Sequence, residues 1–185
     1  MPRHFIRYIY SGIFAISFFL CLKITIPSLA ESVDTLDSEI IKKYQKIILQ
    51  EPSNTNAHFN LGAVYSEKGM TSEAVDEYDE ALRLTPNDLS TLYNRGVLYL
   101  QNGRLNEASA DMKKIIEINP KLSAAHHKLG DVYQKQGHFD DAIAEYKRAL
   151  EISPDLKEAL ISLEDTYRLK EKKTKNQGSR EIKKR

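Results

Sequence analysis

The segment TNAHFNLGAVYSEKGMTSEAVDEYDEALRLTPND, residues 55–88, is followed by two further 34-residue segments that carry the same landmark residues. Six of the eight glycines fall at two positions of this segment, and four of the six prolines lie 34 residues apart. A fixed period of roughly 20 to 50 residues is the signature of a repeat architecture. The sequence therefore predicts three tandem copies of one unit. The periodic residues are Pro52, Pro86, Pro120, Pro154, Gly62, Gly96, Gly130, Gly69, Gly103 and Gly137.

Each copy has the pattern of two amphipathic helices. In the first copy, apolar spacing predicts a helix over Thr55–Lys68 that Gly69 ends in a left-handed conformation. A second helix is predicted over Ser72–Leu84, and Pro86 stops it. Gly62 and the alanines of the second helix are small enough for the two helices to approach closely. We therefore expect an all-α fold built from helix-turn-helix units.

These landmarks resemble the tetratricopeptide repeat family, with whole units at 55–88, 89–122 and 123–156. The resemblance implies an α-solenoid that serves as a protein-interaction scaffold rather than an enzyme. It is carried by the run Ala57-His58-Phe59-Asn60-Leu61-Gly62 together with Tyr65, Gly69, Ala74, Tyr78, Ala81 and Pro86.

The ends of such a stack need caps, because one unit cannot bury its apolar face alone. Leu36–Gln50 has isoleucines on one face, which predicts an N-terminal half-repeat capping helix within residues 31–54. Residues 157–170 continue the first-helix pattern with Glu164 in place of the expected glycine, and we predict a C-terminal capping helix there. Residues 171–185 lack an apolar period and predict a basic disordered tail.

Residues 1–30 have the pattern of a secretory signal peptide. Arg3 and Arg7 precede an apolar run, and small side chains near its end predict cleavage between Ala30 and Glu31. The apolar run of 14 residues over Ile9–Leu22 is shorter than the roughly 20 residues that cross a bilayer core. The alternative is an uncleaved inner-membrane anchor over residues 5–22. Both interpretations place the folded body outside the cytoplasm, in the periplasm or the extracellular space.

Charge is distributed unevenly along the chain. Residues 31–167 carry a net charge of −9, whereas residues 168–185 hold nine Lys or Arg against Glu171 and Glu181. A basic tail suits nucleic acid, but outside the cytoplasm an anionic membrane surface or an acidic partner fits better, so no nucleic-acid partner is expected. A tail that only improves solubility is a further alternative.

The resemblance also implies a binding site, because the first helices of this family line a concave groove. One row across these helices is aromatic, and a second row of Asn60, Asn94 and Lys128 offers donors suited to peptide groups, with Lys128 favouring an acidic group. The same residue types are common in the first helix of this family whatever the protein binds, so the alternative is that they have a structural role only. The expected groove residues are Asn56, Phe59, Asn60, Ala63, Ser90, Tyr93, Asn94, Val97, Ala124, His127, Lys128 and Asp131.

One mode of recognition in this family is not expected here. Members that clamp the C-terminal carboxylate of chaperones use a set of polar residues, and only Asn94 and Lys128 fall in matching places. Phe59, Ala63 and Ala124 occupy the others. The partner is therefore predicted to be a protein or peptide of another kind.

Arg95 stands where Leu61 and Leu129 are predicted to be buried. A charge in a core requires a partner, and Asp111 on the following helix lies where an antiparallel neighbour meets it. We therefore predict an ion pair between Arg95 and Asp111. The alternative is that the guanidinium extends to solvent.

Motifs for catalysis are absent from the sequence, which has no phosphate loop, no His-Glu-x-x-His pair and no Gly-x-Ser-x-Gly elbow. Cys21 is the only cysteine, and the adjacent His126 and His127 point about 100° apart on a helix, so no metal site is expected. We predict no catalytic residue and no cofactor. The leading hypothesis is an exported adaptor that binds a peptide or partner helix and supports assembly of a cell-envelope or secreted complex. The alternative is a membrane-anchored structural organiser that self-associates through its repeat ends.

Overall fold

The computed structural model describes the backbone of residues 27–182 and the side chains of residues 37–176. Within this part the regular structure is α-helical with no strand, which confirms the predicted all-α fold. The chain divides into two units, Met1–Pro52 and Ser53–Arg185. The first unit contains α2 (Pro27–Gln50). The second contains α3 (Thr55–Glu67), α4 (Thr71–Leu84), α5 (Leu89–Gln101), α6 (Leu105–Ile118), α7 (Ser123–Gln136), α8 (Phe139–Ile152) and α9 (Lys157–Ile182).

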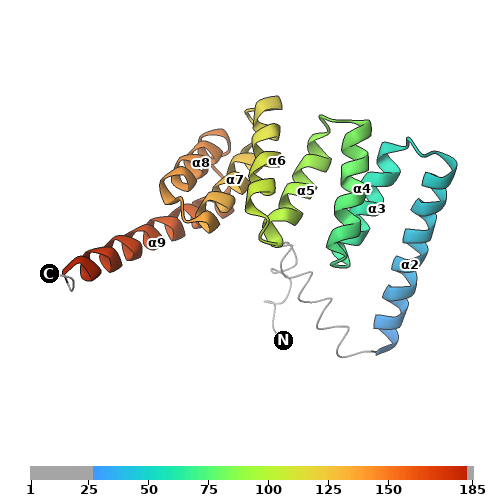
Figure 1. The fold of residues 1–185 in the computed structure, drawn as a ribbon, viewed down its shortest axis with the longest axis horizontal. Coiled ribbons are helices and arrows are strands. Elements are labelled where there is room, and N and C mark those ends of the chain that lie inside the picture. The colour runs from blue at the N-terminus through green and yellow to red at the C-terminus, as the bar shows by residue number, and fades with distance from the viewer. Residues whose placement is uncertain (1–26, 183–185) are drawn as a thin grey trace, which may run out of the picture. The chain divides into compact units, whose positions relative to one another are not determined.

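The second unit is a series of antiparallel helix pairs (Figure 1). Within each repeat the first helix contacts the second, as in α3 with α4, α5 with α6 and α7 with α8. Successive repeats contact through α4 and α5, through α6 and α7, and through α8 and α9. The first helices also contact one another in the order α3, α5, α7 and α9. The solenoid of helix-turn-helix units expected from the period is therefore present.

Glycines end the first helix of every repeat. Gly69, Gly103 and Gly137 have φ angles of +73°, +74° and +76°, in the left-handed region that L side chains rarely adopt. The amide of the next residue then bonds back into the helix, as Met70 N–H does to the Tyr65 carbonyl at 2.9 Å. The predicted role of Gly69 is confirmed. The nearly equal angles give all three repeats the same turn.

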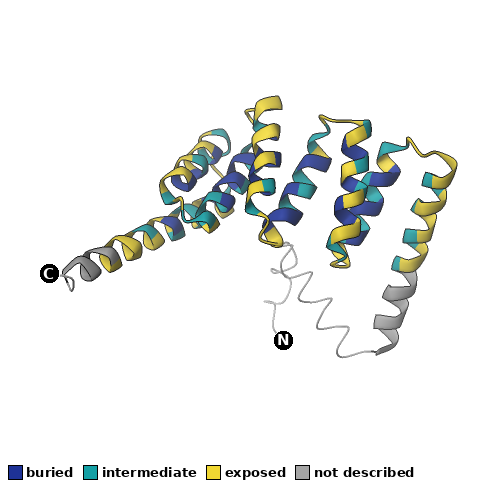
Figure 2. Ribbon diagram, viewed as in Figure 1, coloured by how far each residue is buried: buried dark blue, intermediate teal, exposed yellow. Residues whose placement is uncertain are grey.

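A second set of glycines sets the spacing inside each helix pair. A Cβ on Gly62 would lie 2.9 Å from the Tyr78 ring, and one on Gly130 would lie 2.6 Å from the Tyr146 ring. Both distances are too short for carbon atoms in contact. The buried faces of the paired helices therefore meet with almost no gap, and the buried residues follow the inner side of each helix (Figure 2).

Both helices at the ends are longer than the sequence analysis predicted. α2 begins at Pro27 rather than Leu36, and α9 continues to Ile182, so the predicted boundary at residue 170 is wrong. The physical reason at α9 is a set of contacts with the α7–α8 turn. Lys170 pairs with Asp140, and the Lys173 ammonium donates to the Gly137 carbonyl at 3.2 Å and lies over the Phe139 ring. Lysine contacts rather than an apolar face thus support the helix.

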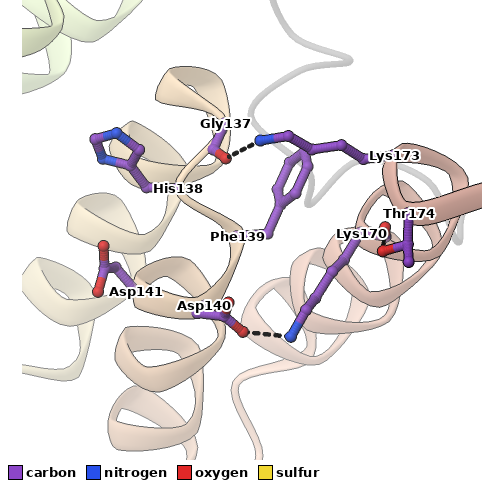
Figure 3. A pocket seen from close by; sticks show the side chains of 8 residues that line it. All are labelled: Gly137, His138, Phe139, Asp140, Asp141, Lys170, Lys173 and Thr174. Carbon is purple, nitrogen blue, oxygen red and sulfur yellow. Dashed lines mark hydrogen bonds and ion pairs between the residues drawn. The ribbon is translucent and has the colours of Figure 1, made fainter. Parts of the chain in front are cut away.

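These contacts surround a shallow pocket of about 370 Å³ between the α7–α8 turn and α9 (Figure 3). Both lysines that reach into it already hold groups of the turn. The pocket is therefore part of the interface between α9 and the α7–α8 helix pair.

The signal-peptide and anchor predictions lie largely outside the described residues. Ala30 and Glu31 fall within α2, and cleavage between them stays a prediction. In the part of the chain that the structure describes, no helix is both long enough and apolar enough to cross a membrane.

Candidate functional site

The predicted groove residues all lie on the first helices, four each on α3, α5 and α7. Asn56 and Ser90 are exposed and His127 is buried, while the other nine are half-buried. Because these helices contact one another in sequence, the residues recur as rows across neighbouring helices. The structure thus brings the predicted set together on one series of helices, and their contact with a partner stays a prediction.

The rows continue onto α9, which the sequence analysis did not include. Ile161, Ser162 and Asp165 follow His127, Lys128 and Asp131 at the same 34-residue spacing. Ser162 lies against α7, with its hydroxyl 3.3 Å from Nε2 of His127. Ile161 keeps 59% of its surface exposed. Extending the period by one helix would have identified these positions.

The aromatic row consists of Phe59, Tyr93 and His127, and two of its rings pack against the second helix of their own repeat. The Phe59 ring lies 6.1 Å from that of Tyr78, and the His127 ring lies 5.8 Å from that of Tyr146. Burial lowers the pKa of His127, which favours the neutral imidazole. Phe59 and His127 therefore have a structural role in addition to any contact with a partner.

In the polar row of Asn60, Asn94 and Lys128, the positive charge of Lys128 is compensated by a neighbouring carboxylate. The Lys128 ammonium donates to Asp131 at 2.8 Å, and the Tyr146 hydroxyl donates to the other oxygen of the same carboxylate at 2.9 Å. Burial raises the pKa of the Tyr78 phenol to about 12, and Asn94, which lies near this group, opposes part of the rise. Since Asp131 balances its charge, Lys128 gives the surface little preference for an acidic group.

The predicted ion pair between Arg95 and Asp111 is present. Arg95 donates Nε and Nη2 to the two carboxylate oxygens of Asp111 at 3.0 and 2.6 Å, and Nη1 to Asp79 at 2.5 Å. Burial alone would lower the pKa of the guanidinium, but the hydrogen bonds and charge of these carboxylates outweigh it and raise the pKa. The second partner, Asp79 on α4, was not predicted.

Comparison of the repeats explains why Arg95 departs from the pattern. In the first repeat His58 bridges to Glu77 at 2.7 Å, and in the third His126 bridges to Glu145 at 2.7 Å. The second repeat has Leu92 at the histidine position and Asp111 at the glutamate position. Its basic residue is instead one helical turn further along, at Arg95. Each repeat thus keeps one base-to-acid bridge between its two helices.

The two adjacent histidines have separate partners. His126 contacts Glu145 and the Pro120 carbonyl, whereas His127 contacts Ser162. Within residues 37–176, no group of three or more His, Cys, Asp or Glu is arranged to hold a metal ion.

Three family models match the chain. Two described as tetratricopeptide repeat match residues 87–155 and 43–76, and one described as TPR repeat matches residues 67–103. No curated protein sequence matches. Similar solved structures include the crystal structure of MamA, at 23% identity and a TM-score of 0.61 over 73% of this chain and 89% of that one. MamA 41-end from Desulfovibrio magneticus RS-1 has 18% identity and a TM-score of 0.69 over 80% and 84%.

A further similar structure contains a bound peptide. It is the first TPR of Spaghetti (RPAP3) bound to the HSP90 peptide SRMEEVD, at 22% identity and a TM-score of 0.60 over 62% of this chain and 91% of that one. At these identities the similarity concerns the fold alone.

Proposed function

Since the chain is a tetratricopeptide repeat protein, we propose that it is a scaffold that binds a peptide or partner helix along its first helices. The observation that carries this proposal is the set of rows that recur every 34 residues from α3 to α9. Side chains that are only half-buried leave area for a partner while their own helices hold them in place.

The composition of the rows favours an uncharged, partly apolar segment. Phe59, Tyr93 and Ile161 offer apolar area, and Asn60 and Asn94 can both donate to and accept from peptide groups. The acidic peptide SRMEEVD is bound by the Spaghetti domain. Here Asp131 balances Lys128, and we do not expect an acidic tail to be preferred.

A comparison of two triple variants tests this proposal. Asn60→Ala, Asn94→Ala and Lys128→Ala together change the first-helix surface. The control, Lys113→Ala, Arg148→Ala and Asp76→Ala, changes three exposed residues of the second helices. Co-purifying proteins would be quantified by mass spectrometry for the wild type and both variants.

We expect partner recovery to fall only in the first variant. Circular dichroism and urea denaturation must show that the first variant stays folded, because Asn94 also contacts Tyr78. Equal recovery by all three proteins would refute binding along the first helices.

We further propose that the scaffold is exported and supports assembly of a cell-envelope or secreted complex. The support is the basic, apolar and small-residue order of residues 1–30. N-terminal sequencing of the purified protein tests this. A start at Glu31 supports a cleaved signal, whereas a retained Met1 supports an anchor over residues 5–22.

A second candidate function is self-association through the repeat ends, as a membrane-anchored organiser would require. The observation that favours it is the half-repeat at each end, because α2 has the period of a second helix and α9 that of a first helix. A basic tail that contacts an anionic membrane belongs to the same candidate.

A further inference from the structure

α9 has the face of a first helix, and among the described helices no second helix follows to cover it. Leu160 and Tyr167 are 49% and 42% exposed, whereas their equivalents His58 and Tyr65 in the first repeat are 6% and 8% exposed. Leu163, between them, is only half-buried. These three residues lie three, four and seven positions apart and therefore form one stripe on the helix. We call it the α9 stripe.

α2 has the register of a second helix, and among the described helices it has no first-helix partner of its own. Ile40, Tyr44 and Ile47 stand 34 residues before Ala74, Tyr78 and Ala81. Those three are at most 1% exposed on α4, where they cover α3, whereas no described residue of α2 is buried. We call Ile40, Tyr44 and Ile47 the α2 stripe.

Steric changes at both stripes make them unsuited to the helices inside the stack. α9 has Glu164 at the glycine position, where even a Cβ on Gly130 would meet Tyr146 at 2.6 Å. α2 has isoleucines at the two alanine positions. Each stripe therefore requires a wider helix spacing than the internal pairs have, and each provides the larger side chains that fill such a spacing.

Charge beside both stripes also differs from that inside the stack. Inside the stack the second helix carries the acid at Glu77, Asp111 and Glu145, but α2 has Lys43 in this register. In the second repeat the glycine position of the first helix lies close to this acid, since a Cβ on Gly96 would be 3.1 Å from the Cβ of Asp111. Glu164 takes the place of that glycine on α9. A helix pair formed from α2 and α9 therefore sets Lys43 beside Glu164.

We propose that the chain associates head to tail, with the α2 stripe of one copy lying on the α9 stripe of a second copy. This inference deepens the self-association candidate by naming its surface and its partner. The junction buries apolar side chains from both copies, and the Lys43–Glu164 pair sets its register. Because the two surfaces differ, the contact is heterologous and extends into rings or filaments.

Charge reversal tests the proposal with the full chain. Lys43→Glu places two carboxylates at the junction, and Glu164→Lys places two ammonium groups there. The matched controls are Lys42→Glu and Glu158→Lys, which make the same charge changes on the faces of the two helices that point away from the stripes. Sedimentation velocity of labelled protein over a wide concentration range measures the size of the assemblies.

We expect each reversal alone to weaken association at least about tenfold, whereas the controls leave it unchanged. An equimolar mixture of the Lys43→Glu and Glu164→Lys proteins should regain wild-type association, because every junction in an alternating assembly then joins opposite charges. Pairing of α2 with α9 inside one copy would not respond to mixing.

Two results would overturn the inference. If neither charge reversal changes the size of the assemblies, the chain self-associates, but not through this junction. A wild-type protein that stays monomeric at every concentration would remove self-association altogether. Neither result affects binding along the first helices, which is measured by partner recovery. Circular dichroism of each variant confirms that the helices are intact.

Discussion

Replacing Arg95 with leucine tests the central ion pair of the second repeat. Leucine is the residue at this position in the first and third repeats, as Leu61 and Leu129, so the change suits the family pattern. It nevertheless removes both hydrogen bonds to Asp111, whose side chain is only 6% exposed. The carboxylate would then stay in the interior without its cation.

The expected loss of stability is about 3 kcal/mol. Removing one partner of a buried ion pair costs about 3 to 5 kcal/mol, chiefly because the remaining charge is unpaired. The lower end applies because the Arg95 side chain is 19% exposed, so water solvates part of the site. The contact with Asp79 adds little, since that carboxylate is 52% exposed.

Urea denaturation followed by circular dichroism measures the loss, and hydrogen exchange locates it in α5 and α6. The first control, Asp79→Asn, should cost less than about 1 kcal/mol. The second is the triple variant Leu92→His, Arg95→Leu and Asp111→Glu, which rebuilds the bridge of the other repeats and should recover most of the stability. A loss below about 1 kcal/mol for Arg95→Leu alone would refute the argument that Asp111 depends on its cation.

Three further predictions follow from the packing. Gly130→Ala should cost about 1 to 3 kcal/mol in urea denaturation, because its Cβ would meet the Tyr146 ring at 2.6 Å, and an unchanged midpoint would contradict the close spacing. Burial lowers the pKa of His127 below its ordinary 6.5, so as the pH falls the imidazole is protonated in the unfolded chain before it is protonated in the folded one. The free energy of unfolding that His127 contributes is therefore fully present above about pH 6.5 and is lost as the pH falls through the folded pKa. His127→Phe should therefore lose less stability than the wild type between about pH 7.5 and 5, and parallel stability curves would exclude this role. Lys170→Ala removes the pair with Asp140 and should speed amide exchange in the last turns of α9 while changing global stability by less than about 1 kcal/mol; unaltered exchange would show that the pair does not hold the helix.

The periodic features of the sequence predicted the fold closely. Prolines and glycines occur at fixed positions because each has one backbone role, so they locate helix ends to within a residue or two. The predicted Thr55–Lys68 helix is α3 (Thr55–Glu67), and Gly69 has the expected left-handed conformation. Arg95 was informative for the opposite reason, because it breaks the period at a buried position.

Features without a period were not predictable in the same way. The length of α9 depends on contacts of Lys170 and Lys173 with the α7–α8 turn, and such polar contacts leave no apolar pattern. The second carboxylate partner of Arg95, Asp79, lies in another repeat, and its contact follows from the stacking of α4 against α5. The pairing of Lys128 with Asp131 is a three-residue helix spacing that the sequence does contain, and it lowers the expected preference for acidic partners.

The contact between Arg95 and Asp79 gives the repeats a fixed order along the chain. The residues equivalent to Asp79 in the second and third repeats are Lys113 and Lys147. A copy of the second repeat placed after either of those would set Arg95 against a lysine, whereas after the first repeat it meets a carboxylate. Duplication of the second repeat in tandem would therefore carry an electrostatic cost. The three units share one backbone plan, but they are not interchangeable.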